Sequence, residues 1–540
     1  MSTRLALISL TCIALATACS AASSEESGGS DLTGTTSVER PVSFLSYVYV
    51  DPNASDPDIQ TAIARQIKTS LGALRDTKVA FDDRGAQSNL DPSKWTRSLV
   101  DVLDPATQNR TGQVLKVAFS YSDKAVVTKS LAQSAVDFVM LAGDYSQHAD
   151  VLKQSCSDDT STDTDSLWYH FQPSLSSCQS LIQGESTRIQ AEQSKLAGHG
   201  GAIGPSEAGR WFSPVTAKLG PANTPKQAYS PEYDRLFALN GDPRSTLTVY
   251  AFFGVDTDES DPDDILGQEA VRFLRTMLAG QPNFRPTKTD PFAMLLDVYV
   301  DGNKLANVTY DEMFGWVLDK SGYPAEVGND ANKIAALRRQ VMSKLAERWI
   351  DWDLPVVVKD GQGDAKSLTV EVRSFYGYED GSADARQHAQ WRYLEAFWYG
   401  DVFLYNGHSH FGHGPLEPTL YGPQNFNDRY QIMLVNSCLS YNYYHEDFLR
   451  MKPGGSKNLE IVVNGSPSYV WGGGEATADF LLAVLSGNQP SYASALGSMR
   501  LDLPWGEKGY DPMRVVDGEL DNAFSQAKTP LSIVVQPPVY

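Results

Sequence analysis

Residues 403–414, FLYNGHSHFGHG, place three histidines and three glycines behind a short apolar run. Histidine is the side chain that most often acts as a metal ligand or as a general base near neutral pH. The stretch is therefore compatible with three chemistries: a zinc site, the nucleophile turn of an esterase, or the base of a cysteine-dependent hydrolase. Each chemistry requires different partners elsewhere in the chain, and those partners separate the three.

Zinc binding requires more ligands than the chain readily supplies. His408, His410 and His413 resemble the H-x-H-x-x-H pattern of metallo-β-lactamase-like hydrolases, in which imidazoles hold zinc. That pattern has an aspartate directly before the third histidine, where this chain has Gly412. It also uses further histidines downstream, where only His445 remains. A zinc hydrolase that uses these three histidines stays an alternative. Our main expectation is a site without metal or cofactor.

The esterase interpretation conflicts with the geometry of its turn. GHSHF resembles the G-x-S-x-G turn, which thrusts a serine out of an α/β-hydrolase sheet. That sharp turn needs a small residue two places after Ser409, and Phe411 stands there. The esterase base should also come late in the chain, yet the last histidine is His445. The sequence therefore disfavours a serine nucleophile.

Cysteine usage indicates an exported protein with one thiol left over. Of five cysteines, Cys12 lies in an N-terminal signal and Cys19 directly follows it. Cys156 and Cys178 flank an acidic, Ser/Thr-rich loop, and we expect them to form a disulfide, because disulfides persist outside the cytosol. Closing that loop stabilises the fold by about 3 kcal/mol in the chain-entropy model. Cys438 remains, either as a buried bystander or as a reactive group.

Cys438 and His408 both follow predicted strands. FLYNGHS ends one strand at His408, and IMLVNSC ends another at Cys438, 438 − 408 = 30 positions later. A connection of this length is enough for the crossover between parallel strands, whose carboxyl ends face a common crevice. We therefore expect the thiol and the imidazole to meet there. The base would take the thiol proton, and the thiolate would attack a carbonyl carbon.

This arrangement resembles the clan CD cysteine peptidases, which include caspases, metacaspases, legumain, gingipains, clostripain and separase. FLYNGHS resembles the metacaspase strand end Y-S-G-H-G, and NSC resembles its strand end D-S-C or D-A-C, within residues 365–540. The resemblance implies that His408 is the base and Cys438 the nucleophile. It also implies an oxyanion hole formed by the backbone N–H groups of Ser409 and Cys438. The chain departs from the family at Ser409, where the family has glycine, and at Asn436, where it has aspartate.

The same resemblance implies a substrate pocket beside the dyad. In that family, segments beyond the cysteine strand help to form the pocket for the residue before the scissile bond. Here the segment is LEIVVNGSPSYVWGGG, so Ser466, Tyr469 and Trp471, together with Asn436, are the candidates. The two aromatic residues are equally compatible with ordinary packing.

The N-terminus is typical of an export signal. MSTRLALISLTCIALATACS has an arginine, a short apolar run and small residues before Cys19. LATAC resembles the lipobox of bacterial lipoproteins, which implies removal of residues 1–18 and lipidation, such as palmitoylation, of Cys19; a plain secretory signal is the alternative. Residues 19–42 would be a flexible Ser/Gly/Thr-rich tether. We expect a protein of the bacterial cell envelope, at the outer membrane or cell surface, that contacts the membrane through its lipid.

Alternating strand-like and helical patterns predict an α/β fold, a mostly parallel sheet sandwiched by helices. The 540 residues suffice for more than one domain, and a Gly/Pro-rich stretch before a new strand places a boundary near residue 240. We expect a non-catalytic N-terminal α/β domain over 43–240 and a caspase-like domain over 241–540. DFVMLAGDYSQH resembles DVFLYNGHSHFG, with Asp144 in the place of His408, so the first domain is either a degenerate duplicate or an unrelated α/β unit.

The charge balance limits the partners. The chain has 45 basic and 66 acidic residues, a net charge of −21, so it repels nucleic acid. We expect a protein or peptide substrate, cleaved through an acyl-enzyme on Cys438. A catalytically inactive surface protein that binds peptide or glycan is the alternative. The sequence does not indicate the preferred substrate residue or the oligomeric state.

Overall fold

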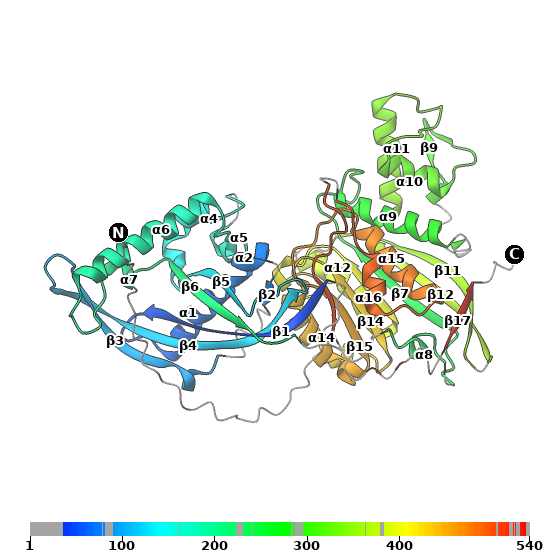
Figure 1. Ribbon diagram of the computed structural model, residues 1–540. Coiled ribbons are helices and arrows are strands. Elements are labelled where there is room, and N and C mark those ends of the chain that lie inside the picture. Colours follow the sequence, from blue (N-terminus) through cyan, green and yellow to red (C-terminus); the bar gives the residue numbers. More distant parts are fainter. Residues whose placement is uncertain are drawn as a thin grey trace, which may run out of the picture.

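The computed structural model describes residues 36–77, 79–81, 90–160, 163–222, 230–239, 241–281, 285–286, 295–361, 363–378, 383–503, 506–517, 522, 524 and 530–535. Over these ranges the chain forms two lobes that lie side by side, each built on its own sheet (Figure 1). The search for helices long and apolar enough to cross a membrane finds none within these ranges.

The first lobe has, among the described residues, a six-stranded sheet in the order β2-β4-β1-β6-β5, with β3 paired to β4. All of these described pairs are antiparallel. The strands are β1 (Ser37–Val50), β2 (Val79–Phe81), β3 (Thr96–Leu103), β4 (Arg110–Thr128), β5 (Ala135–Leu141) and β6 (Phe212–Leu219). The helices are α1 (Asp56–Lys68), α2 (Ser70–Leu74), α4 (Ala149–Cys156), α5 (Leu167–His170), α6 (Ser176–Lys195) and α7 (Pro205–Ala208).

This antiparallel sheet corrects the parallel sheet that we expected for the N-terminal half. Antiparallel sheets can leave one face open to solvent, and β1 does so: Val42 and Phe44 are buried, whereas Leu45 is 78% exposed. The alternation of apolar and polar residues that is typical of such a strand is absent from the sequence of β1. Leu45, Tyr47 and Tyr49 give its solvent-facing side large apolar or aromatic residues as well. The two lobes differ in strand order and direction, which is not the outcome that a duplication would leave.

The second lobe has, over the described ranges, a nine-stranded sheet in the order β16-β15-β14-β13-β7-β12-β11-β17, with β8 paired to β11. The central strands β15, β14, β13, β7 and β12 are parallel, and the flanking pairs are antiparallel. The strands are β7 (Thr246–Phe253), β8 (Arg285–Pro286), β11 (Trp349–Lys359), β12 (Ala365–Tyr376), β13 (Val402–Asn406), β14 (Gln431–Asn436), β15 (Leu459–Asn464), β16 (Arg514–Asp517) and β17 (Ser532–Val535). A separate hairpin pairs β9 (Tyr299–Val300) with β10 (Asn303–Lys304).

The central strands have the order of a doubly wound sheet. Numbered along the chain as β7, β12, β13, β14 and β15, they lie in the order 2-1-3-4-5. The helices of this lobe are α8 (Tyr233–Leu236), α9 (Ile265–Gly280), α10 (Tyr310–Leu318), α11 (Ala331–Leu345), α12 (Ala383–Tyr399), α13 (Ser440–Tyr443), α14 (His445–Met451), α15 (Gly473–Leu485) and α16 (Tyr492–Ser498). The α/β class is therefore confirmed, with a mixed, partly parallel sheet.

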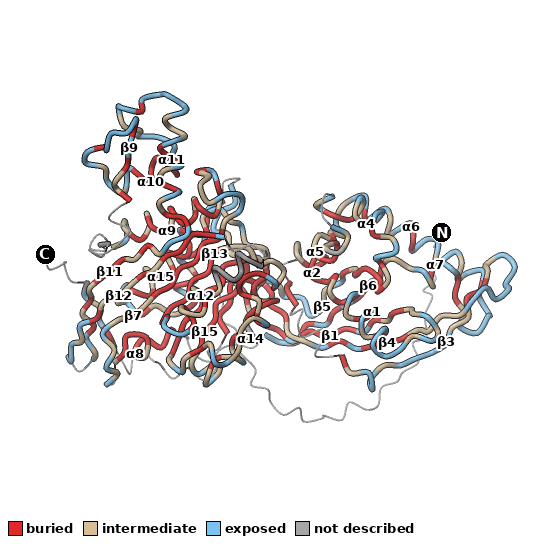
Figure 2. Tube along the Cα trace, turned by 180° about the vertical axis from the view of Figure 1, so that it is seen from behind, coloured by how far each residue is buried: buried red, intermediate tan, exposed pale blue. Residues whose placement is uncertain are grey.

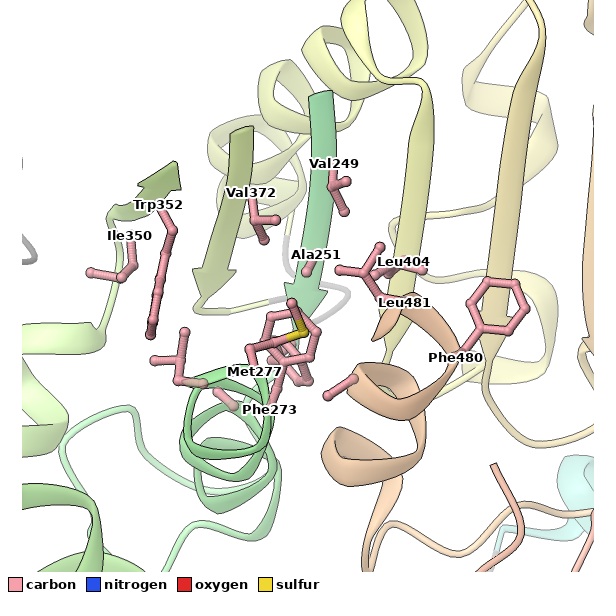
Figure 3. Close-up of a cluster of buried hydrophobic side chains, with 14 of the residues drawn as sticks. Val249, Ala251, Phe273, Met277, Ile350, Trp352, Val372, Leu404, Phe480 and Leu481 are labelled. Carbon is pink, nitrogen blue, oxygen red and sulfur yellow. The ribbon is translucent and has the colours of Figure 1, made fainter. Parts of the chain in front are cut away.

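Helices cover both faces of the second sheet. On one face, Phe273 on α9 and Leu481 on α15 pack toward Ala251 on β7 (Figure 3). On the other face, Phe397 on α12 packs against Phe403 of β13, with the ring centroids 5.2 Å apart. Strands that are buried on both faces consist of continuous apolar runs, and for this reason the central strands could be recognised in the sequence. Figure 2 shows this burial along β7, β12 and β15.

The lobe boundaries differ somewhat from those expected. β1 begins at Ser37, so residues 37–42 of the expected tether belong to a strand. Tyr233 and Leu236 on α8 pack in the core of the second sheet. The change of lobe therefore lies between Leu219 and Tyr233, before the expected residue 240. The expected signal peptide, 1–18, and Cys19 lie outside the described residues.

Candidate active site

Three adjacent parallel strands end at one edge of the second sheet, beside the candidate catalytic residues. Asn406, the last residue of β13, pairs with Asn436, the last residue of β14, and with Phe253, the last residue of β7. His408 and Cys438 each lie two residues beyond these paired ends. The sheet therefore brings both backbones to its carboxyl edge, where sheets of this kind bind ligands.

A row of buried asparagines ties these strand ends together. Asn436 donates from Nδ2 to Asn406 Oδ1 at 2.8 Å, and Asn464, at the end of β15, donates from Nδ2 to Asn436 Oδ1 at 3.1 Å. Arg514 on β16 donates from Nη2 to the same Asn436 oxygen at 3.4 Å. Asn436 is only 3% exposed. It therefore fixes the strand ends relative to one another and does not line the substrate pocket predicted for it.

His408 is paired with a carboxylate from the neighbouring strand end. Its Nε2 lies 3.1 Å from Oδ1 of Asp256, and the two side chains are 42% and 37% exposed. A carboxylate in this position orients the imidazole ring. The Tyr405 hydroxyl donates to the His408 carbonyl oxygen at 2.6 Å, which fixes the backbone on which the imidazole is mounted.

Asp256 is a member of the site that the sequence analysis missed. It lies shortly after β7 in the acidic stretch VDTDESDPD, 152 positions before His408. Asp264, only 1% exposed, holds this loop by accepting hydrogen bonds from the backbone N–H groups of Asp256 and Thr257 at 2.8 and 2.7 Å. The signal in the sequence that could have indicated Asp256 was an acidic residue at the end of a predicted strand. Only the sheet order shows that β7 lies beside β13.

The two backbone groups of the expected oxyanion hole have no acceptor in the structure. Within the described part of the chain, neither the Ser409 N–H nor the Cys438 N–H donates a hydrogen bond. The Ser409 carbonyl accepts a hydrogen bond from the Tyr444 hydroxyl at 2.6 Å, so this segment is held in place. Both N–H groups are therefore unengaged among the described residues, and Ser409 itself is buried.

The turn after Ser409 has an unusual backbone. His410 and Phe411 both have positive φ, 46° and 54°, a region that residues with side chains rarely adopt. Such a conformation persists where the surroundings hold it. Here the Phe411 ring packs edge-to-face against Trp168 and Tyr169 of the first lobe, at centroid distances of 5.4 and 4.8 Å. The loop that carries His408 is thus anchored on the other lobe.

Cys438 is a free, partly exposed thiol among the described residues. Its Sγ donates to the Ser468 carbonyl oxygen at 3.2 Å. Burial raises the pKa of the Cys438 thiol, although its hydrogen bonds with Ser468 oppose this rise. In the described part of the chain, no hydrogen bond joins this sulfur to the His408 ring. The thiol and the imidazole share an edge but have different partners.

The predicted pocket residues divide between two cavities. Ser466 and Tyr469 line a cavity of about 870 Å³ between the lobes, whose other wall includes Arg75 and Asp158. Trp471 lines a separate cavity of about 380 Å³. The segment after β15 therefore borders the space between the lobes through Ser466 and Tyr469, whereas Trp471 lies at another site.

The remaining histidines do not gather into a metal-binding group. The ring centroids of His408 and His410 are 5.8 Å apart, and the His413 side chain is 74% exposed, with Nδ1 3.8 Å from Glu417 Oε2. Among the described residues no cluster of three His, Cys, Asp or Glu side chains could hold a metal ion. The H-x-H-x-x-H spacing is thus not matched by converging side chains.

The predicted disulfide is confirmed. Cys156, at the end of α4, is bonded to Cys178 in α6, and both residues are fully buried in the first lobe. The loop that they close contains α5, and with it Trp168 and Tyr169.

We compared the chain with family models, with curated proteins and with solved structures, and these comparisons found no match.

Proposed function

We propose that this chain is a cell-envelope lipoprotein whose second lobe is a caspase-like cysteine endopeptidase. The observation that carries the proposal is that His408 and Cys438 both lie two residues beyond the paired ends of β13 and β14. The 2-1-3-4-5 order of the parallel strands supports it, because ligands bind at the carboxyl edge of such sheets. The lipid anchor on Cys19 is inferred from the N-terminal sequence.

The reaction begins with proton transfer from the Cys438 thiol to the His408 ring. The sulfur then attacks the carbonyl carbon of the scissile peptide bond, and the carbonyl π electrons move to its oxygen. When the tetrahedral intermediate collapses, the C–N bond breaks and the imidazolium returns its proton to the departing amine. Water, deprotonated by His408, then cleaves the thioester, and the proton passes back to the Cys438 sulfur.

Two features of the site favour this chemistry. The N–H groups of Ser409 and Cys438 can donate to the oxyanion, and such donors are worth more in a preorganised site than in water. The Asp256 carboxylate, 3.1 Å from His408 Nε2, stabilises the imidazolium that forms during each proton transfer. The chain's own side chains and backbone thus supply a base, a nucleophile, an orienting acid and two oxyanion donors.

Labelling with a peptidyl electrophile tests the proposal. We expect covalent modification of Cys438, located by peptide mass spectrometry, at a rate that falls about 10³-fold in His408→Ala, the usual loss when a general base is removed. His413→Ala is the matched control, because this exposed histidine of the same loop has no contact with Asp256 in the described residues. Equal rates in wild type and His408→Ala would refute the dyad.

A non-catalytic binding protein is the second candidate, and the state of the thiol favours it. Burial raises the pKa of Cys438, and its sulfur is hydrogen-bonded to Ser468 rather than to the base. A protein that kept only the fold would bind peptide or glycan in the space between the lobes. Binding of peptides that persists in Cys438→Ala, without any labelling of the wild-type thiol, is the result expected for this candidate.

The lipid anchor has its own test. Cys19→Ser removes the only group that can be lipidated in LATAC, so we expect the protein to move from the membrane fraction to the soluble fraction. Cys12→Ser, in the apolar part of the signal, is the control. Membrane association that survives Cys19→Ser would contradict the lipoprotein assignment.

A further inference from the structure

We propose that the cavity beside the amino end of helix α15 binds a neutral saccharide, with one sugar ring packed on Trp471. The cavity has a volume of about 380 Å³, within the range that proteins use for small ligands. Its lining combines the aromatic Trp471 with charged side chains of both signs. The inference goes beyond the proposed peptidase function and does not depend on it, because neither His408 nor Cys438 lines this cavity.

Three charged side chains of the cavity have no partner of their own. Among the described residues, the side chains of Glu475, Asp479 and Arg500 form no hydrogen bond and no ion pair. Glu475 and Asp479 are one turn apart in α15, so their carboxylates lie on the same face of the helix. Burial, with a smaller effect of Glu475, raises the pKa of Asp479 to about 6. This carboxyl group has therefore lost water without gaining a hydrogen-bond donor from the protein.

The mixture of charges favours a neutral ligand with many hydroxyl groups. Arg272 and Arg500 would repel a cation, and the carboxylates of Glu475 and Asp479 would repel an anion. A hydroxyl group both donates and accepts hydrogen bonds, so it can bond to a carboxylate and to a guanidinium alike. A saccharide carries such hydroxyl groups around a single ring, and it can therefore use both kinds of side chain at once.

Trp471 supplies a surface for the sugar ring itself. It is 41% exposed, and among the described residues its side chain forms no ring contact and no hydrogen bond. The C–H groups on one face of a pyranose ring form an apolar patch that can pack on an indole, while the indole N–H can donate to a hydroxyl group. This exposed indole distinguishes the cavity from an ordinary polar hollow of the surface.

The backbone that carries Trp471 is fixed before any ligand binds. The buried Glu269 carboxylate on α9 accepts hydrogen bonds from the backbone N–H groups of Gly472 and Gly474, at 3.1 and 2.9 Å. The same carboxylate pairs with Arg272 Nε at 3.1 Å, which holds the base of that side chain in the cavity wall. Gly472 has a φ of 78°, a conformation that favours glycine. A site that is ordered in advance loses less entropy when its ligand binds.

Saturation-transfer-difference NMR on the full chain tests this site, because it detects weak binding of unlabelled ligands. The probes are the methyl pyranosides of glucose, galactose, mannose, N-acetylglucosamine and N-acetylgalactosamine. We expect at least one of them to give a signal, strongest on the C–H protons of one ring face. In titrations with that sugar, the dissociation constant should rise about fivefold in Trp471→Ala and about tenfold in Asp479→Ala.

Two further variants separate the site from general effects on the fold. Trp471→Phe keeps an aromatic surface, so it should bind the sugar more tightly than Trp471→Ala does. Trp391→Ala is the matched control, because Trp391 on α12 is 48% exposed and does not line the cavity. This variant should bind the sugar like wild type.

Three results would overturn the proposal. The first is the absence of a signal from all five pyranosides with the wild-type chain. The second is a dissociation constant that Trp471→Ala leaves unchanged, or that Trp391→Ala raises equally. The third is a stronger signal from tetramethylammonium or from glycine than from any sugar, which would show that the cavity selects a cation or a zwitterion instead.

Discussion

The two ends of the central strands in the second lobe use ionisable groups in opposite ways. At the amino ends, Asp401, Glu460 and Lys452 are at most 2% exposed. At the carboxyl ends, the His408 and Asp256 side chains are 42% and 37% exposed. Full burial with multiple partners makes the first set part of the architecture, whereas partial exposure leaves the second set free to meet a substrate. Variants at the two ends should therefore have separable effects.

The largest effect is expected at the amino end, from Arg244→Ala. Arg244 pairs with the buried Asp401 carboxylate, which also accepts the Thr248 N–H at 2.9 Å. Without the guanidinium this carboxylate loses its main partner, and we expect the free energy of unfolding to fall by about 3 kcal/mol. Urea unfolding measures this loss of free energy. The rate of Cys438 labelling should not change at temperatures where the variant is folded.

Lys508→Ala is the matched control for that variant. Lys508 pairs with Asp502 at 2.8 Å, but these side chains are 73% and 60% exposed, so its loss should cost less than about 1 kcal/mol. An Arg244→Ala loss no larger than that of Lys508→Ala would contradict the structural role assigned to the amino ends.

A smaller effect is expected at the carboxyl edge, from Asp256→Asn. The amide cannot stabilise the imidazolium, but the pair is partly exposed, so we expect peptidyl labelling of Cys438 to slow by about tenfold only. The free energy of unfolding should stay within about 0.5 kcal/mol of wild type, as for surface substitutions generally. Asp258→Asn is the control in the same loop, since its Oδ1 accepts from Ser260 and not from His408. Equal rates in the two variants would remove Asp256 from the site.

A last effect, again at the amino end, is a change of pH dependence in Glu460→Gln. Burial raises the pKa of Glu460 from 4.5 to about 8 despite hydrogen bonds from Tyr430 and Tyr492. Between these values the folded chain holds a proton that the unfolded chain has released, so the contribution of Glu460 to the free energy of unfolding falls as pH rises from 5 to 7. Glutamine has no such proton, so we expect this part of the fall to disappear. Unfolding curves across that range measure the difference, with the exposed Glu326→Gln as control. A variant slope equal to that of wild type would contradict the raised pKa.

Much of the second lobe could be predicted from the sequence. β13, β14 and β15 are unbroken apolar runs, because parallel central strands are buried on both faces. In the first lobe the α/β composition was predicted but the direction of the strands was not. There Leu45, Tyr47 and Tyr49 make the solvent-facing side of β1 apolar in sequence, so the strand resembles one that is buried on both faces. Strand direction depends on pairings between residues far apart in the chain, such as Val48 with Val117.

The site was predictable where it follows the ends of strands and not where it depends on other segments. His408 and Cys438 end apolar runs, so their position at the carboxyl edge follows from local pattern and topology. Asp256 lies in the loop after a strand, 152 positions before His408, and the loop that carries His408 packs through Phe411 on Trp168 and Tyr169 of the other lobe. Such contacts depend on the order of strands and on the packing of lobes, which single-sequence patterns do not encode.

The most direct test of the account is a crystal structure of the protein after reaction with a peptidyl electrophile. We predict a bond from the electrophile to Cys438 Sγ, with a His408 ring nitrogen within about 4 Å of the sulfur. The oxygen derived from the carbonyl should lie about 3 Å from the N–H groups of Ser409 and Cys438. An adduct on Cys438 with the His408 ring turned away from the sulfur, or a thiol that remains unmodified, would contradict the account.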